Sequence, residues 1–169
     1  MSSPATLSRT VLAGFLIIAM AMAGCDRSGG YTPKYTYAQA VAKADSLIRD
    51  AAATLTPSPR LEVRYENSLP CSGSFDAADS PLVLVERQYW LRDLEPRNNP
   101  HVFEQMFQYW KQNGFTLART LGPEDQYDQL RKAVATGPDD FNQSIVQAVG
   151  GEMSIRVQSP CVYDPDEAT

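Results

Sequence analysis

The chain carries few positive charges, and they are not clustered. Fifteen lysines and arginines stand against twenty aspartates and glutamates, so the formal net charge at pH 7 is -5. Only four of the cations are lysines, and the arginines are scattered along the chain. A general nucleic-acid binder needs a basic face to neutralise phosphates, and electrostatic binding to anionic lipids needs a cluster of lysines and arginines. The composition therefore argues against both functions.

Motifs for catalysis and for cofactor binding are also missing. The sequence has no Gly-x-Ser-x-Gly elbow, no Gly-x-Gly-x-x-Gly or Walker-type loop, no Cys-x-x-Cys pair and no internal repeat. The acidic dipeptides Glu124-Asp125 and Asp139-Asp140 have no calcium-loop spacing. Adjacent strand residues also point to opposite faces, so neither dipeptide forms a carboxylate pair. We therefore expect no cofactor, no metal ion and no enzymatic activity.

The single histidine, His101, is the one residue on which a catalytic alternative can rest. It stands in the first turn of a predicted helix, where the positive end of the helix dipole disfavours the imidazolium and would suit a general base. Glu104 follows three residues later on the same helix. A small envelope hydrolase using His101 and a nearby carboxylate is thus the alternative function. A surface histidine at a helix start is the simpler interpretation.

The front of the chain indicates export. Arg9 is followed by the apolar run 11–23, "VLAGFLIIAMAMA". As a helix this run would reach only about 20 Å, whereas a hydrocarbon core is about 30 Å thick. Residues 1–24 are therefore predicted to be a signal peptide rather than a permanent membrane span.

The end of that segment resembles the bacterial lipobox, in which a small residue precedes a cysteine that is lipidated before cleavage. Met22-Ala23-Gly24-Cys25 fits it, with methionine where leucine is usual. The resemblance implies that Cys25 carries a diacylglycerol and begins the mature protein, because two acyl chains hold a domain durably at a bilayer. An ordinary signal peptide, with Cys25 left as a free thiol, is the alternative.

The chain has three cysteines, an odd number for an exported protein. Lipidation of Cys25 leaves Cys71 and Cys161 as an even pair in a location that permits disulfides. We therefore predict a Cys71–Cys161 disulfide. Because it would close a long loop, the chain-entropy model assigns it roughly 4 to 5 kcal/mol.

The mature chain divides into a tether and one domain. Residues 25–35 hold the lipidated cysteine and a tether rich in glycine, serine and proline, and residues 36–169 form a single α+β domain. Apolar spacing predicts helices over 37–55 and 99–113, the second capped by Asn99 and stopped at Gly114. Strands are predicted at 60–66, 81–94 and 115–121, and a hairpin at 141–158 turns at Gly150-Gly151. The expected fold is one antiparallel sheet with both helices packed on one face.

Residues 123–136 give conflicting signals. Pro123 at a helix-start position, Tyr127, Leu130 and Val134 at helical spacings, and Gly137 as a stop favour a helix. A strand here would instead continue a meander from 115–121 into the hairpin. We favour the strand because the family resemblance described next implies a strand before the terminal hairpin.

Several of these features occur together in one group of proteins. The lipobox, the "YWL" strand, the helix ending before "NGF" and the terminal hairpin closing on "SPCVY" resemble small actinobacterial envelope lipoproteins of uncharacterised function. The resemblance covers most of the mature chain. It implies structural roles for Cys25, Cys71 and Cys161 and supplies no activity.

These observations predict a lipoprotein anchored on the extracytoplasmic face of the cell membrane. Its partners would be the lipid bilayer, through acylated Cys25, and an unknown envelope protein or ligand, with no nucleic acid. The domain would act as a binding or scaffolding module. The sheet face without helices is the candidate contact surface, and the polar strand residues there are Asn142, Ser144, Ser154, Arg156 and Gln158. Ordinary solvated strand positions would show the same pattern.

Overall fold

The computed structural model describes residues 32–71, 81–123 and 129–164. Two helices and six strands make up this part of the chain. Their bounds, in chain order, are α1 (Tyr37–Ala53), β1 (Arg60–Pro70), β2 (Leu82–Arg92), the short 3-10 helix η2 (Pro96–Asn98), α2 (Asn99–Gln112), β3 (Thr116–Leu121), β4 (Arg131–Thr136), β5 (Asn142–Gln147) and β6 (Met153–Tyr163).

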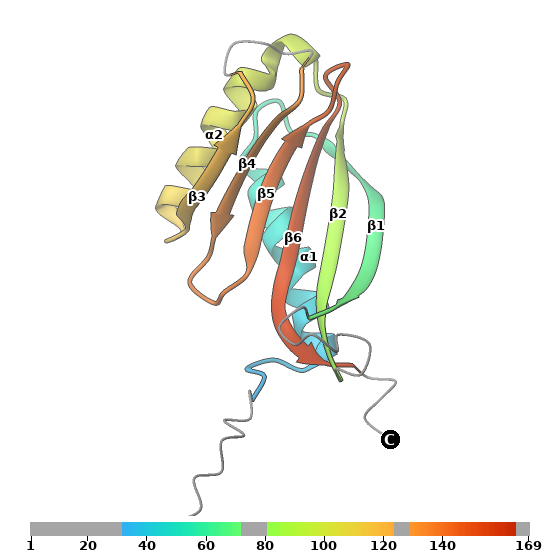
Figure 1. Cartoon of the computed structure of the whole chain (residues 1–169). Coiled ribbons are helices and arrows are strands. Elements are labelled where there is room, and N and C mark those ends of the chain that lie inside the picture. Colours follow the sequence, from blue (N-terminus) through green and yellow to red (C-terminus); the bar gives the residue numbers. More distant parts are fainter. Residues whose placement is uncertain (1–31, 72–80, 124–128, 165–169) are drawn as a thin grey trace, which may run out of the picture. The chain divides into compact units, whose positions relative to one another are not determined.

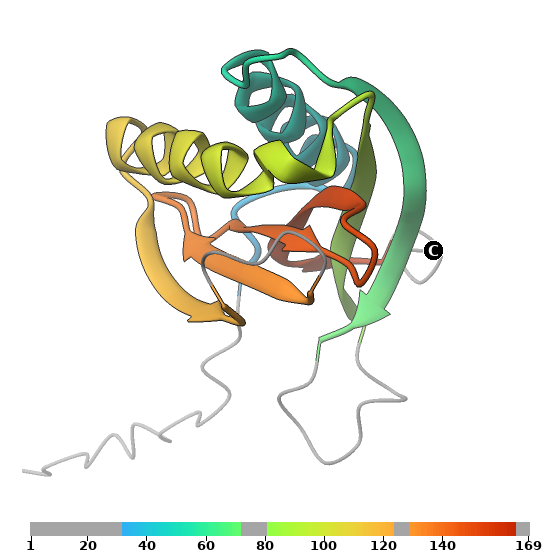
Figure 2. The ribbon, with the colours of Figure 1, turned by 90° about the horizontal axis from the view of Figure 1, so that it is seen from above.

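The strands form one antiparallel sheet in the order β1-β2-β6-β5-β4-β3 (Figure 1). Both helices lie on the same face of this sheet (Figure 2). The predicted α+β class, the single antiparallel sheet and the helices on one face are therefore confirmed. The last strand of the chain does not add to an edge: β6 inserts between β2 and β5, so it occupies the centre with β5.

Helix α1 begins with a capping box. The Thr36 hydroxyl accepts from the backbone N–H of Gln39 at 3.3 Å, and the Gln39 side chain accepts from the backbone N–H of Thr36 at 2.9 Å. This reciprocal pair satisfies two N–H groups that the first turn leaves without helical partners. The buried stripe of α1 then faces the sheet, and its members are Ala40, Ala44, Ile48, Ala51 and Ala52.

The start of α2 differs from the prediction. Asn99 is not the cap but the first residue of the helix, and Asn98 occupies the cap position without a side-chain hydrogen bond. The Asn99 side chain is fully buried and donates to the carbonyl oxygen of Gly151 at 2.8 Å. Asparagine was expected to bond its own helix, but here it ties α2 to the β5–β6 turn. Gly114, with φ of 73°, follows the helix as predicted.

The core lies between the helices and the sheet. The apolar stripe of α2 belongs to it: Phe103, Met106 and Trp110 are at most 2% exposed. From the sheet, Ile145 of β5 and Ile155 of β6 lie side by side in the register and are fully buried. The stripe is thus a packing surface and not a ligand site.

The second half of the ambiguous segment 123–136 forms a strand. Residues 131–136 form β4, which pairs with β3 on one side and β5 on the other. Residues 124–128 lie outside the described part of the chain, and with them Glu124, Asp125 and Tyr127. Within β4, the alternate residues Arg131, Ala133 and Ala135 are buried toward the helices. This two-residue period follows from pairing with β5, which the local helical spacing could not reveal.

The predicted disulfide is present. The sulfur atoms of Cys71 and Cys161 lie 2.08 Å apart, their Cα atoms are 6.1 Å apart, and the two residues are separated by 90 positions. Cys71 follows β1, and its backbone N–H donates to the Leu82 carbonyl oxygen at 2.9 Å. The bridge therefore joins the end of β1 to the end of β6 across β2.

Candidate functional site

Cys25, the predicted lipidation site, lies outside the described residues. Neither α1 nor α2, the two α-helices in the described part of the chain, has the length and apolar character that a membrane-spanning helix needs. Among residues 32–71, 81–123 and 129–164, no three His, Cys, Asp or Glu side chains come together in a way that could hold a metal ion.

His101 lies exposed on α2. Together with Glu104 and Gln108 it lines a shallow hollow of about 280 Å³ beside Thr54. The Glu104 carboxylate accepts a hydrogen bond from Gln108 at 2.9 Å, and the Thr54 hydroxyl donates to the Ala51 carbonyl oxygen at 2.7 Å. Within the described structure no hydrogen bond reaches the imidazole, and no serine lines the hollow. His101 and Glu104 thus line one hollow, and the Thr54 hydroxyl beside them is engaged by the Ala51 carbonyl oxygen.

The sheet face without helices holds a buried charge pair. The register places Glu86 opposite Gln158, and Gln88 opposite Arg156. The Glu86 carboxylate forms an ion pair with the Arg156 guanidinium at 3.2 Å and accepts a hydrogen bond from the Gln158 amide at 2.8 Å, and its side chain is only 7% exposed. Of the predicted contact residues, Arg156 and Gln158 are therefore already engaged within the domain.

The two serines predicted for that surface are buried within it. Ser154 is 1% exposed and accepts a hydrogen bond from Gln88 at 2.8 Å, and Ser144 is 5% exposed. Asn142 is half-buried and accepts from the Thr136 hydroxyl at 2.8 Å. The register places Ser144 opposite Arg156 and Ser154 opposite Trp90, so both serines belong to the open face, but they are not exposed there for contact. The polar side chains of this face thus mainly form hydrogen bonds and ion pairs with one another.

Cations gather on the same face. The pKa of the Lys132 amine is lowered from its usual value, chiefly by burial and then by the charges of Arg156 and Arg119. Nearer the β1 edge, the Trp90 ring lies 4.1 Å from the Arg64 guanidinium carbon and 4.9 Å from that of Arg92. The Trp90 ring, which a ligand could otherwise contact, is therefore already engaged in cation–π contacts.

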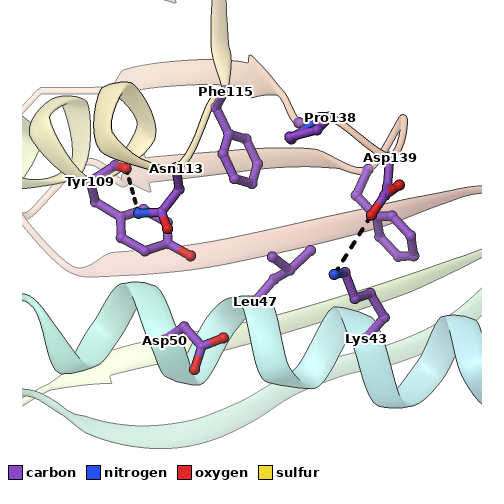
Figure 3. Close-up of a pocket in the computed structure, with 10 residues that line it drawn as sticks. Lys43, Leu47, Asp50, Tyr109, Asn113, Phe115, Pro138 and Asp139 are labelled. Atoms are coloured by element: carbon purple, nitrogen blue, oxygen red, sulfur yellow. Dashed lines mark hydrogen bonds and ion pairs between the residues drawn. The ribbon is translucent and has the colours of Figure 1, made fainter.

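A better-shaped site lies between the two helices and the β4–β5 turn (Figure 3). It is a cavity of about 310 Å³, at the small end of the range for ligand pockets. We call it the interhelical cleft, and its lining residues are Lys43, Leu47, Asp50, Tyr109, Asn113, Phe115, Gly137, Pro138, Asp139 and Phe141.

The polar groups of the interhelical cleft lie at its two ends. At one end Lys43 Nζ lies 3.7 Å from the Asp139 carboxylate, which also pairs with Lys34. The hydrogen bond from Lys34 is the main cause that lowers the pKa of Asp139. Asp139 lies in the β4–β5 turn, and its carboxylate ties this turn to α1.

The other end of the cleft is formed by Asp50, Tyr109 and Asn113 (Figure 3). Burial raises the pKa of the Tyr109 phenol, and the charge of Asp50 adds to the effect. The phenol therefore stays protonated at neutral pH and can act as a hydrogen-bond donor beside a carboxylate. Leu47, Phe115 and Phe141 supply the apolar wall between the two ends.

Sequence reasoning missed the interhelical cleft. Its α1 residues, Lys43, Leu47 and Asp50, occupy neighbouring positions on one helix face, which is a detectable local signal. Their partners, Tyr109 and Asp139, are distant in sequence and meet them only through packing. No spacing along the chain could have joined them.

No protein-family profile matches this chain, and no curated protein or solved structure shows significant similarity to it.

Proposed function

We propose that this protein is a lipoprotein held on the extracytoplasmic face of the cell membrane, where its domain serves as a binding module. One observation carries the proposal: Cys71 and Cys161 are bonded to each other, which leaves Cys25 as the remaining one of three cysteines. Disulfides persist in oxidising compartments outside the cytoplasm. The bridge thus supports export and leaves the lipobox thiol available for an acyl chain.

The anchor itself is inferred from Met22-Ala23-Gly24-Cys25. Two acyl chains, at about 0.8 kcal/mol for each buried methylene, hold a domain durably where one chain does not. In this proposal the protein is of the same kind as the small actinobacterial lipoproteins that its motifs resemble. The acidic domain would then stay at the membrane through its lipid and not through charge.

The interhelical cleft is the proposed ligand site, because it combines an apolar wall with polar groups at both ends. Asp50 and the Tyr109 phenol suit an ammonium group or another hydrogen-bonding group of a ligand, and Leu47 with Phe115 suits an apolar part. The ligand class that this chemistry fits is a small amphipathic component of the envelope, such as an amine with an apolar or aromatic substituent.

Lipidation is tested by metabolic labelling with an alkyne analogue of palmitate, followed by partition into detergent. The wild-type chain should label and enter the detergent phase, whereas Cys25→Ser should do neither. The matched control is Cys71→Ser/Cys161→Ser, which removes two thiols and should still label. A wild-type chain that stays in the aqueous phase with an unmodified Cys25 would overturn the anchor.

Ligand binding is tested with a photoreactive residue in place of the exposed Asn113, in the full-length chain on its own membrane. Irradiation should give one defined adduct, and Leu47→Asp should abolish it by charging the apolar wall. The same photoreactive residue at Val149, which is 79% exposed in the β5–β6 turn, is the control. Identical adducts from both positions would reject the interhelical cleft as the site.

The hydrolase alternative rests on His101 and Glu104, and it makes a different prediction. If the imidazole is a general base, His101→Ala should abolish hydrolysis by the protein. If the domain is a binding module, the His101→Ala variant should still bind its ligand and give the photo-adduct at position 113, because His101 does not line the interhelical cleft.

A further inference from the structure

A second cavity, of about 510 Å³, lies where the chain enters the domain. It forms between the segment leading into α1 and the end of β6, which Figure 1 shows at the same end of the sheet. We call it the tyrosine groove, and its lining residues are Pro33, Lys34, Tyr35, Thr36, Tyr37, Ala38, Gln39, Tyr163 and Asp164.

The rings of the tyrosine groove are held in place by the rest of the domain. The Tyr37 hydroxyl shares a hydrogen bond of 2.7 Å with the hydroxyl of Ser68, near the end of β1. The Tyr35 ring packs edge-on against Phe141, with centroids 5.4 Å apart. Tyr163, at the end of β6, is 52% exposed. The groove therefore presents the exposed Tyr163 ring and the accessible parts of the half-buried Tyr35 and Tyr37 rings on a fixed framework.

The disulfide strengthens the same end of the sheet. Cys161 stands two residues before Tyr163, and its bridge to Cys71 fastens the end of β1 to the end of β6. Just beyond, the backbone N–H of Asp164 donates to the Pro81 carbonyl oxygen at 2.8 Å. The disulfide and this hydrogen bond thus hold together the end of β1, the end of β6 and the start of β2 near the groove.

If Cys25 is acylated, the position of the groove in the chain limits its distance from the bilayer. This step rests on the proposed function. Only residues 26–31 separate Cys25 from Thr32, the first described residue. At no more than about 3.6 Å per residue, this stretch spans at most about 25 Å. Thr32 stands directly before the groove residues, so the tyrosine groove cannot lie far from the surface of the bilayer.

Tyrosine is well suited to that surface. Its ring is apolar and its hydroxyl is polar, and tyrosines concentrate at membrane interfaces for this reason. Charge contributes less at this end, because the Lys34 amine is paired with Asp139 and the groove also holds Asp164. The chain as a whole is acidic, so contact with an anionic leaflet must come from the rings.

We propose that the tyrosine groove is a membrane-contact surface that takes phospholipid headgroups of the bilayer in which the Cys25 lipid is embedded. The contact orients the domain: the end of β6 faces the membrane and the β5–β6 turn faces away. β6 has 11 residues, so these two ends are separated by roughly 33 Å. A tether alone would leave the domain free to tumble.

The test uses the full-length lipidated protein in vesicles of phosphatidylcholine that carries a nitroxide on its headgroup. Tyr163→Trp places a fluorescent reporter in the groove, and Val149→Trp places a matched one at the far end, since both positions are at least half exposed. Fluorescence is read as the difference from the parent, which has two tryptophans. The nitroxide should quench the Tyr163→Trp reporter at least three-fold more than the Val149→Trp reporter.

The same preparations are labelled with the palmitate analogue, and non-reducing mass spectrometry checks that the bridge remains. Equal quenching of both reporters, or of neither, in an acylated protein would overturn the membrane contact while the anchor stands. A groove occupied by a second copy of the chain would leave Tyr163→Trp unquenched and yield cross-linked dimers, which also overturns it. An unacylated wild-type chain removes the anchor and the contact together.

Discussion

The Glu86 carboxylate and the Arg156 guanidinium lie 3.2 Å apart on the sheet face that carries no helix. The glutamate side chain is 7% exposed and that of the arginine 30%. Glu86 is on β2 and Arg156 on β6, so the pair crosses the junction between the first hairpin and the rest of the sheet. A buried carboxylate without its cation is costly, so each partner constrains what can replace the other.

Arg156→Met should therefore lower the free energy of unfolding by about 2 to 4 kcal/mol, since Glu86 keeps only its bond from Gln158. Adding Glu86→Gln should restore much of the loss, because the buried charge is then gone. Urea denaturation measures both. The control is Arg60→Ala, which breaks exposed ion pairs with Glu62 and Asp93 and should leave stability unchanged. Equal losses in the single and double variants would contradict this account.

Gln143 joins three elements in the core. Its side-chain oxygen accepts from the Trp110 indole N–H at 2.5 Å, and its amide donates to the Leu47 carbonyl oxygen at 3.0 Å. Gln143→Leu keeps the volume but leaves the buried indole N–H without a partner, at a cost of about 1 to 3 kcal/mol. Thermal unfolding and the near-ultraviolet circular dichroism of Trp110 should both change. The exposed Gln108→Leu is the control, and an unaltered melting temperature for Gln143→Leu would refute the linking role.

The disulfide should account for a large share of the stability. Its two cysteines are 90 positions apart, and the chain-entropy model assigns such a loop roughly 4 to 5 kcal/mol. Cys71→Ser/Cys161→Ser should lower the melting temperature by about 10 to 15 °C for a domain of this size. Peptide mapping without reductant should find the 71–161 pair in the wild-type protein. Free thiols at both positions would contradict the structure.

Because of Lys132, the stability of the domain should increase as the pH rises into the alkaline range. Its folded pKa lies below that of the unfolded chain because of burial and the charges of Arg156 and Arg119. Between the two pKa values the unfolded state binds more protons, so stability increases with pH through that window, and the destabilisation is fully present below it. Carbon-13 NMR titration of the four lysine side chains should show Lys132 titrating first.

Lys132→Met should then raise stability at neutral pH and flatten the rise below pH 10.5, the ordinary lysine value. Lys111→Met, on the exposed side of α2, should change neither. If Lys132 titrates at the ordinary lysine value of 10.5, the burial and the cationic field inferred for the open face are wrong.

Much of the local structure was predictable because its causes are local. Thr36 and Gln39 cap α1 within one turn, and Gly150 and Gly151, with φ of 90° and 88°, close the β5–β6 turn. Cys71 and Cys161 were predicted as partners from the number of cysteines and the export signal, without any knowledge of distance. The aromatic residues of α2 share a face through helical spacing alone. Lipidation of Cys25 remains a prediction.

Long-range packing alone decided the rest. The segment 123–136 carries helical spacings at Tyr127, Leu130 and Val134, but hydrogen bonding to β3 and β5 makes residues 131–136 a strand. Asn99 was suited to cap its own helix, but burial against the β5–β6 turn gave it the Gly151 carbonyl instead. The order of the strands, with β6 between β2 and β5, and the meeting of Asp50 with Tyr109 in the interhelical cleft also depend on contacts between distant segments. The sequence by itself determined which residues are buried together on α1 and α2 and which cysteines pair. Only the tertiary structure decided which elements are neighbours, because pairing between strands and helices is selected by the free energy of the whole core.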